Sequence, residues 1–338
     1  MIEILSSAAL STVQDMGRLG HLRFGVGTSG AMDQLALQAG NLMLGNPATM
    51  AAIEVPVLPF QVRFLNDVDF AVTGAAVSAN LDGVDLPPWW MRRARAGQVL
   101  TLGAPGQGFR AGSRSYLTVA GGVHVPQVLG SRSTQLRGRF GGHQGRPLVQ
   151  GDVLPGQHLP AAKNDLGAGF GVLPPSLALP QSDFFDALPQ DKTPVTALRV
   201  VPAAEYENFD TPSRKVFWDS PWKISAQSDR YGYRLSGVPL ALSQPIETRS
   251  HGIVPGVIQV PHGGQPIIQM RDAQPSGGYP KIGTVIEADL WRLGQAPAGS
   301  LVRFVPCTYA QAVDALEPLQ AYLEKLRQLT VLYRQLYD

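Results

Sequence analysis

The apolar residues of this chain come in short runs that are repeatedly interrupted by turn-forming residues. Examples are QVRFL, DFAVTGA, QVLTLG, SYLTVAGG, VIQV, PIIQM, TVIEADL and LVRFV, which are rich in Val, Leu, Ile and Thr. The 338 residues include 37 Gly and 28 Pro, and Gly, Pro, Asp or Asn bound these runs. Runs of this kind are typical of strands in sandwiches and barrels. The sequence therefore predicts a mainly β fold.

Two segments carry helical spacing instead. In GAMDQLALQAGNLMLGNP, which begins at Gly30, apolar residues recur at helical intervals, Asp33 stands in the first turn, and Gly45 and Pro47 end the pattern. The C-terminal residues 311–338 are also predicted to be helical, with a break near Pro318, because proline pushes the preceding residue out of the helical region. We expect this amphipathic tail to pack on another subunit.

The strand pattern lapses in the middle of the chain. Residues 156–194 are rich in proline and small residues and show no sustained period, which is typical of a linker. We therefore expect a first β domain over 1–155, the linker, a second β domain over 195–310 and a C-terminal helix over 311–338. The likeness of RFGVGTSG to RYGYRLSG favours duplicated barrels, although Gly and Arg also recur by composition alone.

Charge and composition exclude several classes of protein. With 28 basic and 26 acidic side chains the formal net charge is +2, too small a field to favour nucleic acid or an anionic membrane. No apolar run approaches the roughly 20 residues of a membrane span. The start, MIEILSSAALSTVQD, lacks the features of a signal peptide, so we expect a cytoplasmic protein.

The chain has a single cysteine, Cys307, which excludes an internal disulfide and a cysteine-based metal cluster. We interpret Cys307 as a structural thiol and predict no metal site.

Three polar clusters are candidates for a binding site. In the first, TVQDMGRLGHLRFGVGTSGAMD, Gln14, Asp15 and Arg18 flank a glycine turn, and Ser29 leads into the helix near Asp33. A helix N-terminus with a nearby arginine suits a carboxylate or a carbonyl oxygen. The alternative is that Ser29 caps the helix and that Asp15 and Arg18 form a salt bridge in the turn.

The second cluster is GSRSTQLRGRFGG. Ser131, Arg132, Ser133 and Thr134 offer hydroxyl and guanidinium donors to an anion, and the glycines allow close backbone approach. Three further arginines are interpreted as ordinary solvated charges on a long loop: Arg137, Arg139 and Arg146.

The third cluster is GVIQVPHGGQPIIQMRDAQPSGGYPKIG. Strand-like segments present Gln259, Gln269 and Asp272, and converging amides, a carboxylate, a phenol and a lysine could bind a small polar amide. The turn contributes Gly277, Gly278, Tyr279 and Lys281. The alternative is a hairpin turn with a satisfied tyrosine and an exposed lysine, and His262 is interpreted as a turn residue. No HExxH, GxSxG or Walker lysine is present, and GAPGQGFR lacks the Lys-Ser/Thr ending of a nucleotide loop.

At these residues the chain resembles a known family. The motifs are TVQDMGRLGHLRFGVGTSGAMDQLALQAGNLMLGN, VAGGVHVPQVLGSRSTQL with FGGHQGRPLVQGDVL, and PGVIQVPHGGQPIIQMRD with SGGYPKIGTVIEADLWRLGQ, spread over about residues 3–305. They closely resemble the biotin-dependent carboxyltransferase family, also called allophanate hydrolase subunit 2. This family includes the C-type subunit of 5-oxoprolinase, the KipA-type proteins and the carboxyltransferase part of urea carboxylase.

The resemblance implies two cyclophilin-like β-barrel domains with a few helices. For the stand-alone bacterial member it implies a subunit of an ATP-dependent 5-oxoprolinase, a hydrolase that opens 5-oxoproline (pyroglutamate) to glutamate with companion subunits of types A and B. Which subunit binds ATP is left open. Preorganised donors would stabilise the oxyanion that forms when the lactam opens. Our hypotheses for individual roles are Arg132 or Arg18 for a substrate carboxylate and Asp15 or Asp272 for proton transfer.

The sequence also departs from the family pattern. Tyr231 stands where the family commonly has methionine, and Ala273 and Pro275 stand where it commonly has arginine and threonine, which leaves the substrate open. The chain lacks an Ala-Met-Lys-Met biotin attachment site, so biotin would have to arrive on another protein. This ranks lactam hydrolysis above carboxyl transfer to urea or another amide. The alternative from a different class is a non-catalytic KipA-type regulator that binds a kinase inhibitor.

Overall fold

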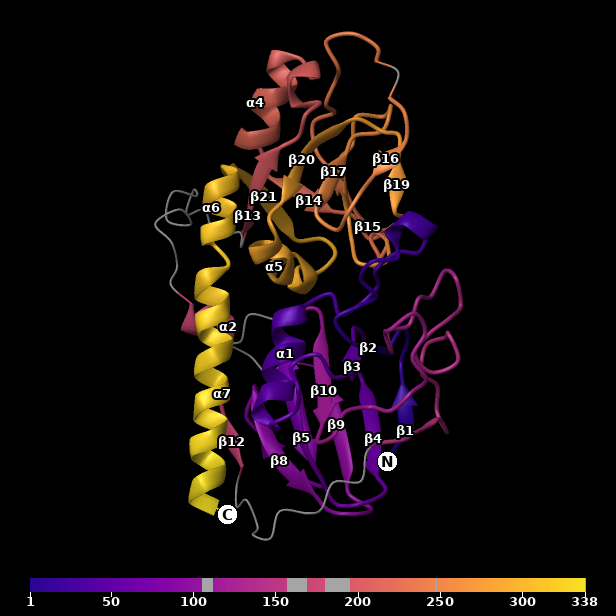
Figure 1. Ribbon diagram of the computed structural model, residues 1–338, viewed down its shortest axis with the longest axis vertical. Helices are drawn as coiled ribbons and strands as arrows, with labels where there is room; N and C mark the ends of the chain where they lie inside the picture. The colour runs from indigo at the N-terminus through magenta and orange to yellow at the C-terminus, as the bar shows by residue number, and fades with distance from the viewer. Residues whose placement is uncertain (105–111, 157–168, 180–194, 247, 338) are drawn as a thin grey trace. The chain divides into compact units, whose positions relative to one another are not determined.

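The computed structural model describes residues 1–104, 112–156, 169–179, 195–246 and 248–337 (Figure 1). The chain divides into two compact units: unit 1 contains residues 1–18, 29–179 and 319–338, and unit 2 contains residues 19–28 and 180–318. This division departs from the expected boundaries, because residues 19–28 belong to unit 2 and residues 319–338 to unit 1. Within the expected linker, residues 169–179 belong to unit 1, whereas 157–168 and 180–194 lie outside the described residues.

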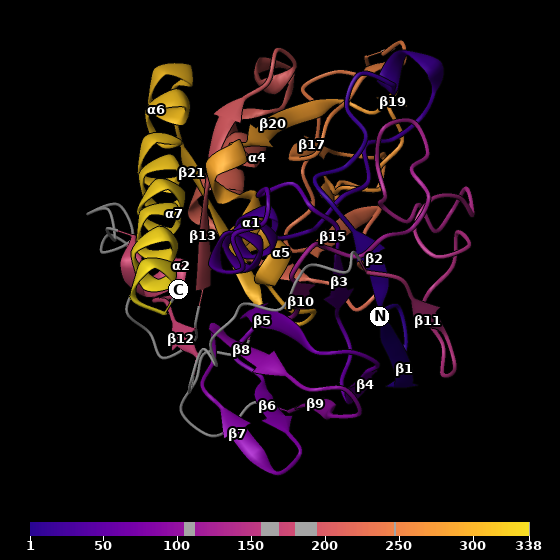
Figure 2. The same cartoon turned by 60° about the horizontal axis from the view of Figure 1, so that its bottom comes forward.

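Two six-stranded sheets form the body of unit 1 (Figure 1, Figure 2). Their strand orders are β11-β1-β4-β9-β6-β7 and β12-β8-β5-β10-β3-β2. Side chains from both sheets, including Ile4, Phe64, Phe70 and Leu117, bury in one common core. The strands are β1 (Ile2–Ser7), β2 (Thr12–Gln14), β3 (Ala52–Val55), β4 (Phe60–Phe64), β5 (Val68–Gly74), β6 (Ser78–Leu81), β7 (Val84–Leu86), β8 (Trp90–Ala94), β9 (Val99–Gly103), β10 (Ser115–Val119), β11 (Val153–Leu154) and β12 (Phe170–Gly171).

The predicted helix after Gly30 is confirmed as α1 (Gln34–Met43), which packs on β5 and β10. It is shorter than its apolar pattern, because Asp33 is the N-cap residue rather than part of the first turn. The Asp33 carboxylate accepts a hydrogen bond from the Ala36 amide at 2.9 Å. A short helix, α2 (Pro175–Ala178), follows β12.

Two helices end the chain, α6 (Tyr309–Asp314) and α7 (Glu317–Tyr337), so the predicted break near Pro318 is confirmed. Pro318 lies in the first turn of α7, where its missing N–H costs little. Part of the apolar face of the tail packs on its own chain, and its packing on another subunit stays a prediction. The Tyr322 hydroxyl donates to the Leu173 carbonyl at 2.8 Å, and the Tyr333 ring lies 4.3 Å from that of Phe170, all within unit 1.

The strands of unit 2 close into a seven-stranded barrel in the order β13-β20-β17-β18-β15-β14-β21. The pair β13 and β21 is parallel. The buried aromatic residues of unit 2 include Trp222, Phe217 and Phe304. The barrel strands are β13 (Val195–Pro202), β14 (Trp222–Ile224), β15 (Gly232–Ser236), β17 (Val257–Gln259), β18 (Ile267–Gln269), β20 (Lys281–Val285) and β21 (Leu301–Pro306). Outside it lie η1 (Leu22–Phe24), η2 (Tyr206–Asn208), α4 (Thr211–Asp219), β16 (His251–Gly252), β19 (Ser276–Gly277), η3 (Glu287–Asp289) and α5 (Leu290–Gln295).

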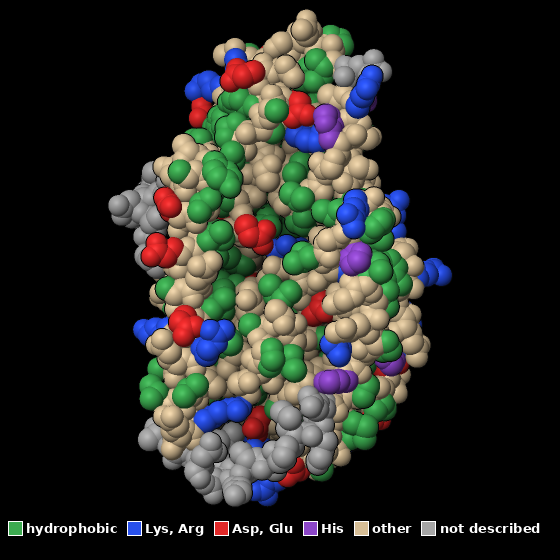
Figure 3. Space-filling model, in the orientation of Figure 1, with side chains coloured by type: hydrophobic (Ala, Val, Ile, Leu, Met, Phe, Trp, Pro, Cys, Tyr) green, Lys and Arg blue, Asp and Glu red, His purple; other side chains and the backbone are tan. Residues whose placement is uncertain are grey.

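The predicted mainly β class with a few helices is therefore confirmed, with a closed barrel in unit 2 and two sheets around a common core in unit 1. Cys307 is buried, and burial raises the pKa of its thiol, which agrees with its interpretation as a structural residue. In the described part of the chain, no helix has the length and apolarity that crossing a membrane requires. The face shown in Figure 3 carries both acidic and basic side chains, scattered among hydrophobic and uncharged ones.

Candidate functional site

The Asp15 carboxylate binds the loop that contains the second polar cluster. Asp15 follows β2 and is only 8% exposed. Its Oδ1 accepts hydrogen bonds from the Gly17 amide at 2.8 Å, the Ser131 hydroxyl at 2.6 Å and the Ser133 hydroxyl at 2.5 Å. Its Oδ2 accepts from the Arg132 amide at 2.5 Å. The first and second clusters of the sequence therefore meet in unit 1.

Arg18 donates hydrogen bonds to backbone carbonyl groups of the same loop. The side chain is 1% exposed, and its Nη2 donates to the Ser133 carbonyl at 2.5 Å and its Nε to the Val128 carbonyl at 3.3 Å. Its guanidinium lies 4.9 Å from the centre of the Phe140 ring. Of the two arginines suggested for a substrate carboxylate, Arg18 is thus committed to the backbone of its own chain.

Arg132 is held differently. Its amide is bound by Asp15 and its Nε donates to the Val125 carbonyl at 3.0 Å, while the side chain is half-buried. Within the described ranges its two Nη atoms have no hydrogen-bond partner. A guanidinium that is anchored at Nε and open at Nη can bind a planar carboxylate through two parallel hydrogen bonds.

Arg146, in contrast, is not a solvated charge, and that prediction is wrong. Its Nη1 and Nη2 each lie 2.7 Å from the Asp152 carboxylate, and His143 Nε2 lies 3.3 Å from the same group. The hydrogen bonds from Arg146 lower the pKa of Asp152 from 3.8 to about 2. Arg137 and Arg139 are exposed, as the sequence predicted.

We expect Asp152 to make the stability of unit 1 depend on acidity. Because its folded-state pKa lies below its ordinary value, the ion pair stabilises the fold above about pH 4, and this stabilisation is lost as the pH falls through about 2. Urea unfolding at several pH values checks this for the wild type and for Asp152→Asn. The stability difference between them should shrink steadily from about pH 5 to about pH 2. A difference that stays constant over this range would contradict the assignment.

The N-terminus of α1 is occupied by acidic groups of the chain itself. Glu54, 1% exposed on β3, accepts hydrogen bonds at 2.8 Å from the Met32 amide and from the Tyr116 hydroxyl. The Tyr116 oxygen accepts from the Asp33 amide at 2.8 Å, and burial raises the pKa of this phenol well above its ordinary value. Arg114 Nε lies 3.8 Å from Glu54. Asp33 itself occupies the Ala36 amide, which is therefore not open to a substrate anion, and an anion site here stays a prediction.

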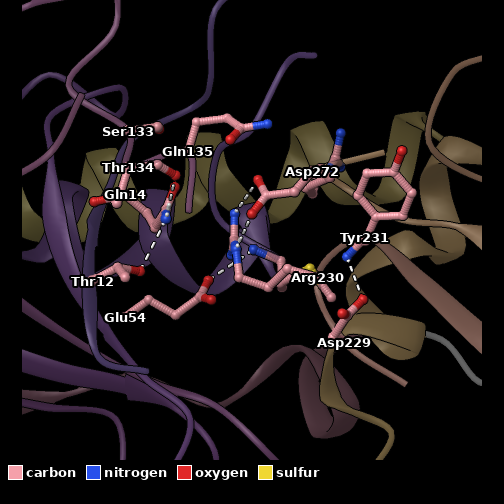
Figure 4. A network of polar contacts seen from close by, with 12 residues as sticks. Thr12, Gln14, Glu54, Ser133, Thr134, Gln135, Asp229, Arg230, Tyr231 and Asp272 are labelled. Carbon is pink, nitrogen blue, oxygen red and sulfur yellow. Dashed lines mark hydrogen bonds and ion pairs between the residues drawn. The ribbon is translucent and has the colours of Figure 1, made fainter. Parts of the chain in front are cut away.

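Ser29 is not the cap either, contrary to the alternative interpretation. It is fully buried with φ +53°, and its hydroxyl has no partner within the described residues. Gln14, also fully buried, donates through Nε2 to the Thr12 hydroxyl at 2.9 Å and to the Thr134 carbonyl at 3.2 Å (Figure 4). Gln14 thus ties β2 to the loop that Asp15 and Arg18 bind.

In unit 2, Asp272 forms a buried ion pair that the sequence did not reveal. Arg230 donates to it through Nε at 3.0 Å and Nη2 at 3.1 Å (Figure 4). The Asp272 amide also donates to the Arg230 carbonyl at 2.8 Å. Tyr231, which replaces a methionine of the family pattern, donates its hydroxyl to Gln274. Asp272 is therefore paired, although the arginine expected beside it is Ala273.

The two glutamines of the third cluster are joined. Gln269 donates to Gln259 at 3.0 Å, and Gln259 donates to the Tyr279 carbonyl at 3.5 Å. A Cβ on Gly277 would lie 2.4 Å from Gln259 Nε2, so glycine is required for this approach. Lys281 is buried and lies 3.5 Å from Glu205, which makes the alternative of an exposed lysine wrong.

A groove of about 800 Å³ lies beside these residues in unit 2. It brings Gly278 and Tyr279 together with Thr248 and His262, whose ring meets that of Tyr279 edge-on at 6.1 Å. Its described lining includes no Lys, Arg, Asp or Glu. His262 lies in a turn, as the sequence predicted, and forms part of this wall. Gln259, Gln269, Asp272 and Lys281 are not among the lining residues.

Two sequence expectations concern other ligands. Within the described ranges, no group of three or more His, Cys, Asp and Glu side chains could hold a metal ion. The segment GAPGQGFR lies outside the described residues from position 105 to its end.

The model of the family "Carboxyltransferase domain, subdomain A and B" matches residues 24–306, and the chain belongs to this family. This chain is 41% identical to the C-type subunit of 5-oxoprolinase from Escherichia coli (strain K12), over 96% of this chain and 97% of that protein. It is 40% identical to the protein of the same name from Haemophilus influenzae, over 97% and 98% respectively.

More distant relatives are parts of larger proteins. Urea amidolyase of Saccharomyces cerevisiae is 30% identical over 96% of this chain, which spans 18% of that protein. Among solved structures, the urea carboxylase of Kluyveromyces lactis superposes with a TM-score of 0.82 at 28% identity, over 96% of this chain and 29% of that one.

Proposed function

We propose that this chain is the C-type subunit of an ATP-dependent 5-oxoprolinase, which opens 5-oxoproline to glutamate together with companion subunits. The observation that carries the proposal is Arg132, a half-buried guanidinium anchored at Nε with its Nη edge open among the described residues. 5-Oxoproline bears a carboxylate that matches this edge, whereas urea is neutral. The identities of 41% and 40% to two 5-oxoprolinase subunits of this type, along nearly their whole length, favour the same substrate.

In this proposal the chain recognises and orients the lactam. Arg132 binds the substrate carboxylate and so fixes the ring relative to the 131–134 loop. Neither carboxylate suggested for proton transfer is open to a substrate: Asp15 accepts four hydrogen bonds and Asp272 is paired with Arg230. The groove of unit 2 is a poor match for a triphosphate, since its described lining has no Lys or Arg. In this proposal ATP binds to a companion subunit.

The test is 5-oxoproline-dependent phosphate release by the chain co-expressed with its type A and type B companions. We expect Arg132→Ala to raise KM for 5-oxoproline about 10- to 100-fold, because a hydrogen bond to a charged group contributes about 1.5–3 kcal/mol. Arg139→Ala, an exposed arginine of the same loop, is the matched control and should leave KM unchanged.

The outcomes separate the possible functions. Phosphate release with urea and bicarbonate, but not with 5-oxoproline, would replace the proposal with carboxyl transfer. An intact complex that releases phosphate with neither substrate would leave a regulatory, non-catalytic role.

A further inference from the structure

We propose that Asp15 is a positioning residue for Arg132 and does not transfer protons. This inference rests on the proposed function, in which Arg132 binds the substrate carboxylate. It assigns to Asp15 the task of fixing the loop from which Arg132 projects.

The hydrogen bonds and the burial of Asp15 argue against a role as a base. An ionised carboxylate accepts at about four lone-pair sites. Oδ1 receives the Gly17 amide and the hydroxyls of Ser131 and Ser133, and Oδ2 receives the Arg132 amide at 2.5 Å. A general base needs an open lone pair within reach of the substrate proton. Three donors engage Oδ1 and one engages Oδ2, and with only 8% of Asp15 exposed, the remaining acceptor site on Oδ2 is poorly accessible to a substrate.

The same hydrogen bonds fix the backbone on both sides of Arg132. The hydroxyls of Ser131 and Ser133 converge on one oxygen of Asp15, and the Ser133 amide donates to Ser131 Oγ at 3.0 Å. Arg132 stands between these two serines, with its own amide on the other carboxylate oxygen. These hydrogen bonds restrain the backbone from which the Arg132 side chain extends.

A second anchor then orients the guanidinium. The Val125 carbonyl accepts from Arg132 Nε at 3.0 Å, which leaves the Nη edge as the end that can meet a ligand. A planar anion such as a carboxylate is the class of group that this edge binds with two hydrogen bonds. Asp15 and Val125 together preorganise Arg132, so less conformational freedom is lost on binding.

Asp15→Asn distinguishes positioning from proton transfer. Asparagine keeps the shape but turns one acceptor oxygen into an NH2 donor, which would face donors of the loop. We expect KM for 5-oxoproline in the complex to rise about 10-fold with kcat nearly unchanged, because a displaced binding group weakens substrate orientation. The pH profile of kcat should keep its shape. In the Arg132→Ala background the substitution should add little to KM, since both changes act through one contact.

The matched control is Asp152→Asn, which changes a carboxylate of unit 1 that is as buried as Asp15 but is paired with Arg146 and does not contact Arg132. It should leave KM unchanged. A fall in kcat of about 100-fold or more for Asp15→Asn, with loss of one limb of the pH profile, would overturn the inference, since proton transfer typically contributes that much.

Amide hydrogen exchange provides a readout that is independent of activity. In Asp15→Asn the amides of Arg132 and Ser133 should exchange faster, because their hydrogen bonds to Asp15 and Ser131 are weakened. Unchanged exchange would overturn the inference. A third outcome is faster exchange in Asp15→Asn with an unaltered KM in Arg132→Ala. Asp15 would then still position Arg132, but the proposed contact between Arg132 and the substrate would be rejected. Should Asp15→Asn fail to fold, Ser131→Ala removes one of the same hydrogen bonds and should shift exchange and KM in the same direction.

Discussion

Asp289→Asn is expected to lower the free energy of unfolding of unit 2 by about 3 kcal/mol. Asp289 is fully buried and accepts hydrogen bonds from the Arg199 amide at 2.8 Å, from its Nε at 2.9 Å and from its Nη2 at 2.7 Å. Arg292 Nε lies 3.6 Å away. Asparagine fills the same space but leaves the Arg199 guanidinium without the negative charge of Asp289. The expected cost lies at the lower end for a broken buried pair, because these arginine side chains keep 21% and 24% of their surface exposed.

The matched control is Glu287→Gln, two residues earlier in the same element. Glu287 also pairs with an arginine, Arg271, at 2.9 Å, but its side chain is 56% exposed. Exposed pairs contribute about 0–1 kcal/mol, so this substitution should hardly change stability. Urea unfolding followed by tryptophan fluorescence measures both variants. Equal costs for the two substitutions would show that burial does not set the strength of these pairs.

Arg199 and Asp289 also show why part of this fold could not be predicted from the sequence. Strand and helix positions follow local periodicity, so α1 was predictable, as were the strands β4, β5, β9, β10, β17, β18 and β21. The interpretation of TVIEADL as a strand is wrong beyond Val285, because the chain continues there into η3 and α5. The partner of a buried charge is a long-range property: Arg199 and Asp289 are 90 positions apart, and Arg230 and Asp272 are 42 apart. Nothing local distinguishes Glu54 or Arg230 from a solvated charge, apart from the position of Glu54 inside the apolar strand AIEV.

The candidate site was predictable in its members but not in their roles. Asp15, Ser131, Arg132 and Ser133 were all proposed, in two separate clusters about 116 positions apart in the chain. The residue types indicated anion binding, because hydroxyls, a guanidinium and glycines occur together. That Asp15 binds its own loop and that Arg18 binds carbonyl groups depend on how β2 and this loop come together. Only the three-dimensional structure supplies that arrangement.

A second large effect, on both stability and KM, is expected for the substitution Gly141→Ala in the same loop. Gly141 has φ +69°, and a Cβ there would lie 2.2 Å from the Ser133 carbonyl oxygen and 2.6 Å from Arg18 Nη2. The backbone must therefore shift at the point where Arg18 binds Ser133. The neighbouring Gly142 amide donates to the Arg132 carbonyl at 3.1 Å, so the shift reaches Arg132 as well.

We expect Gly141→Ala to lower the free energy of unfolding by about 3 kcal/mol, since left-handed strain costs about 1 kcal/mol and overpacking about 1–3 kcal/mol. KM for 5-oxoproline should rise at least about 10-fold, because Arg132 loses its preorganised position. Gly130→Ala is the matched control: its φ is +76°, but nothing lies within 4 Å of the added Cβ. Gly130→Ala should lower the free energy of unfolding only by the strain of the left-handed backbone, and it should leave KM unchanged. If both variants raised KM equally, the left-handed conformation rather than the close contact with Ser133 and Arg18 would control the position of Arg132.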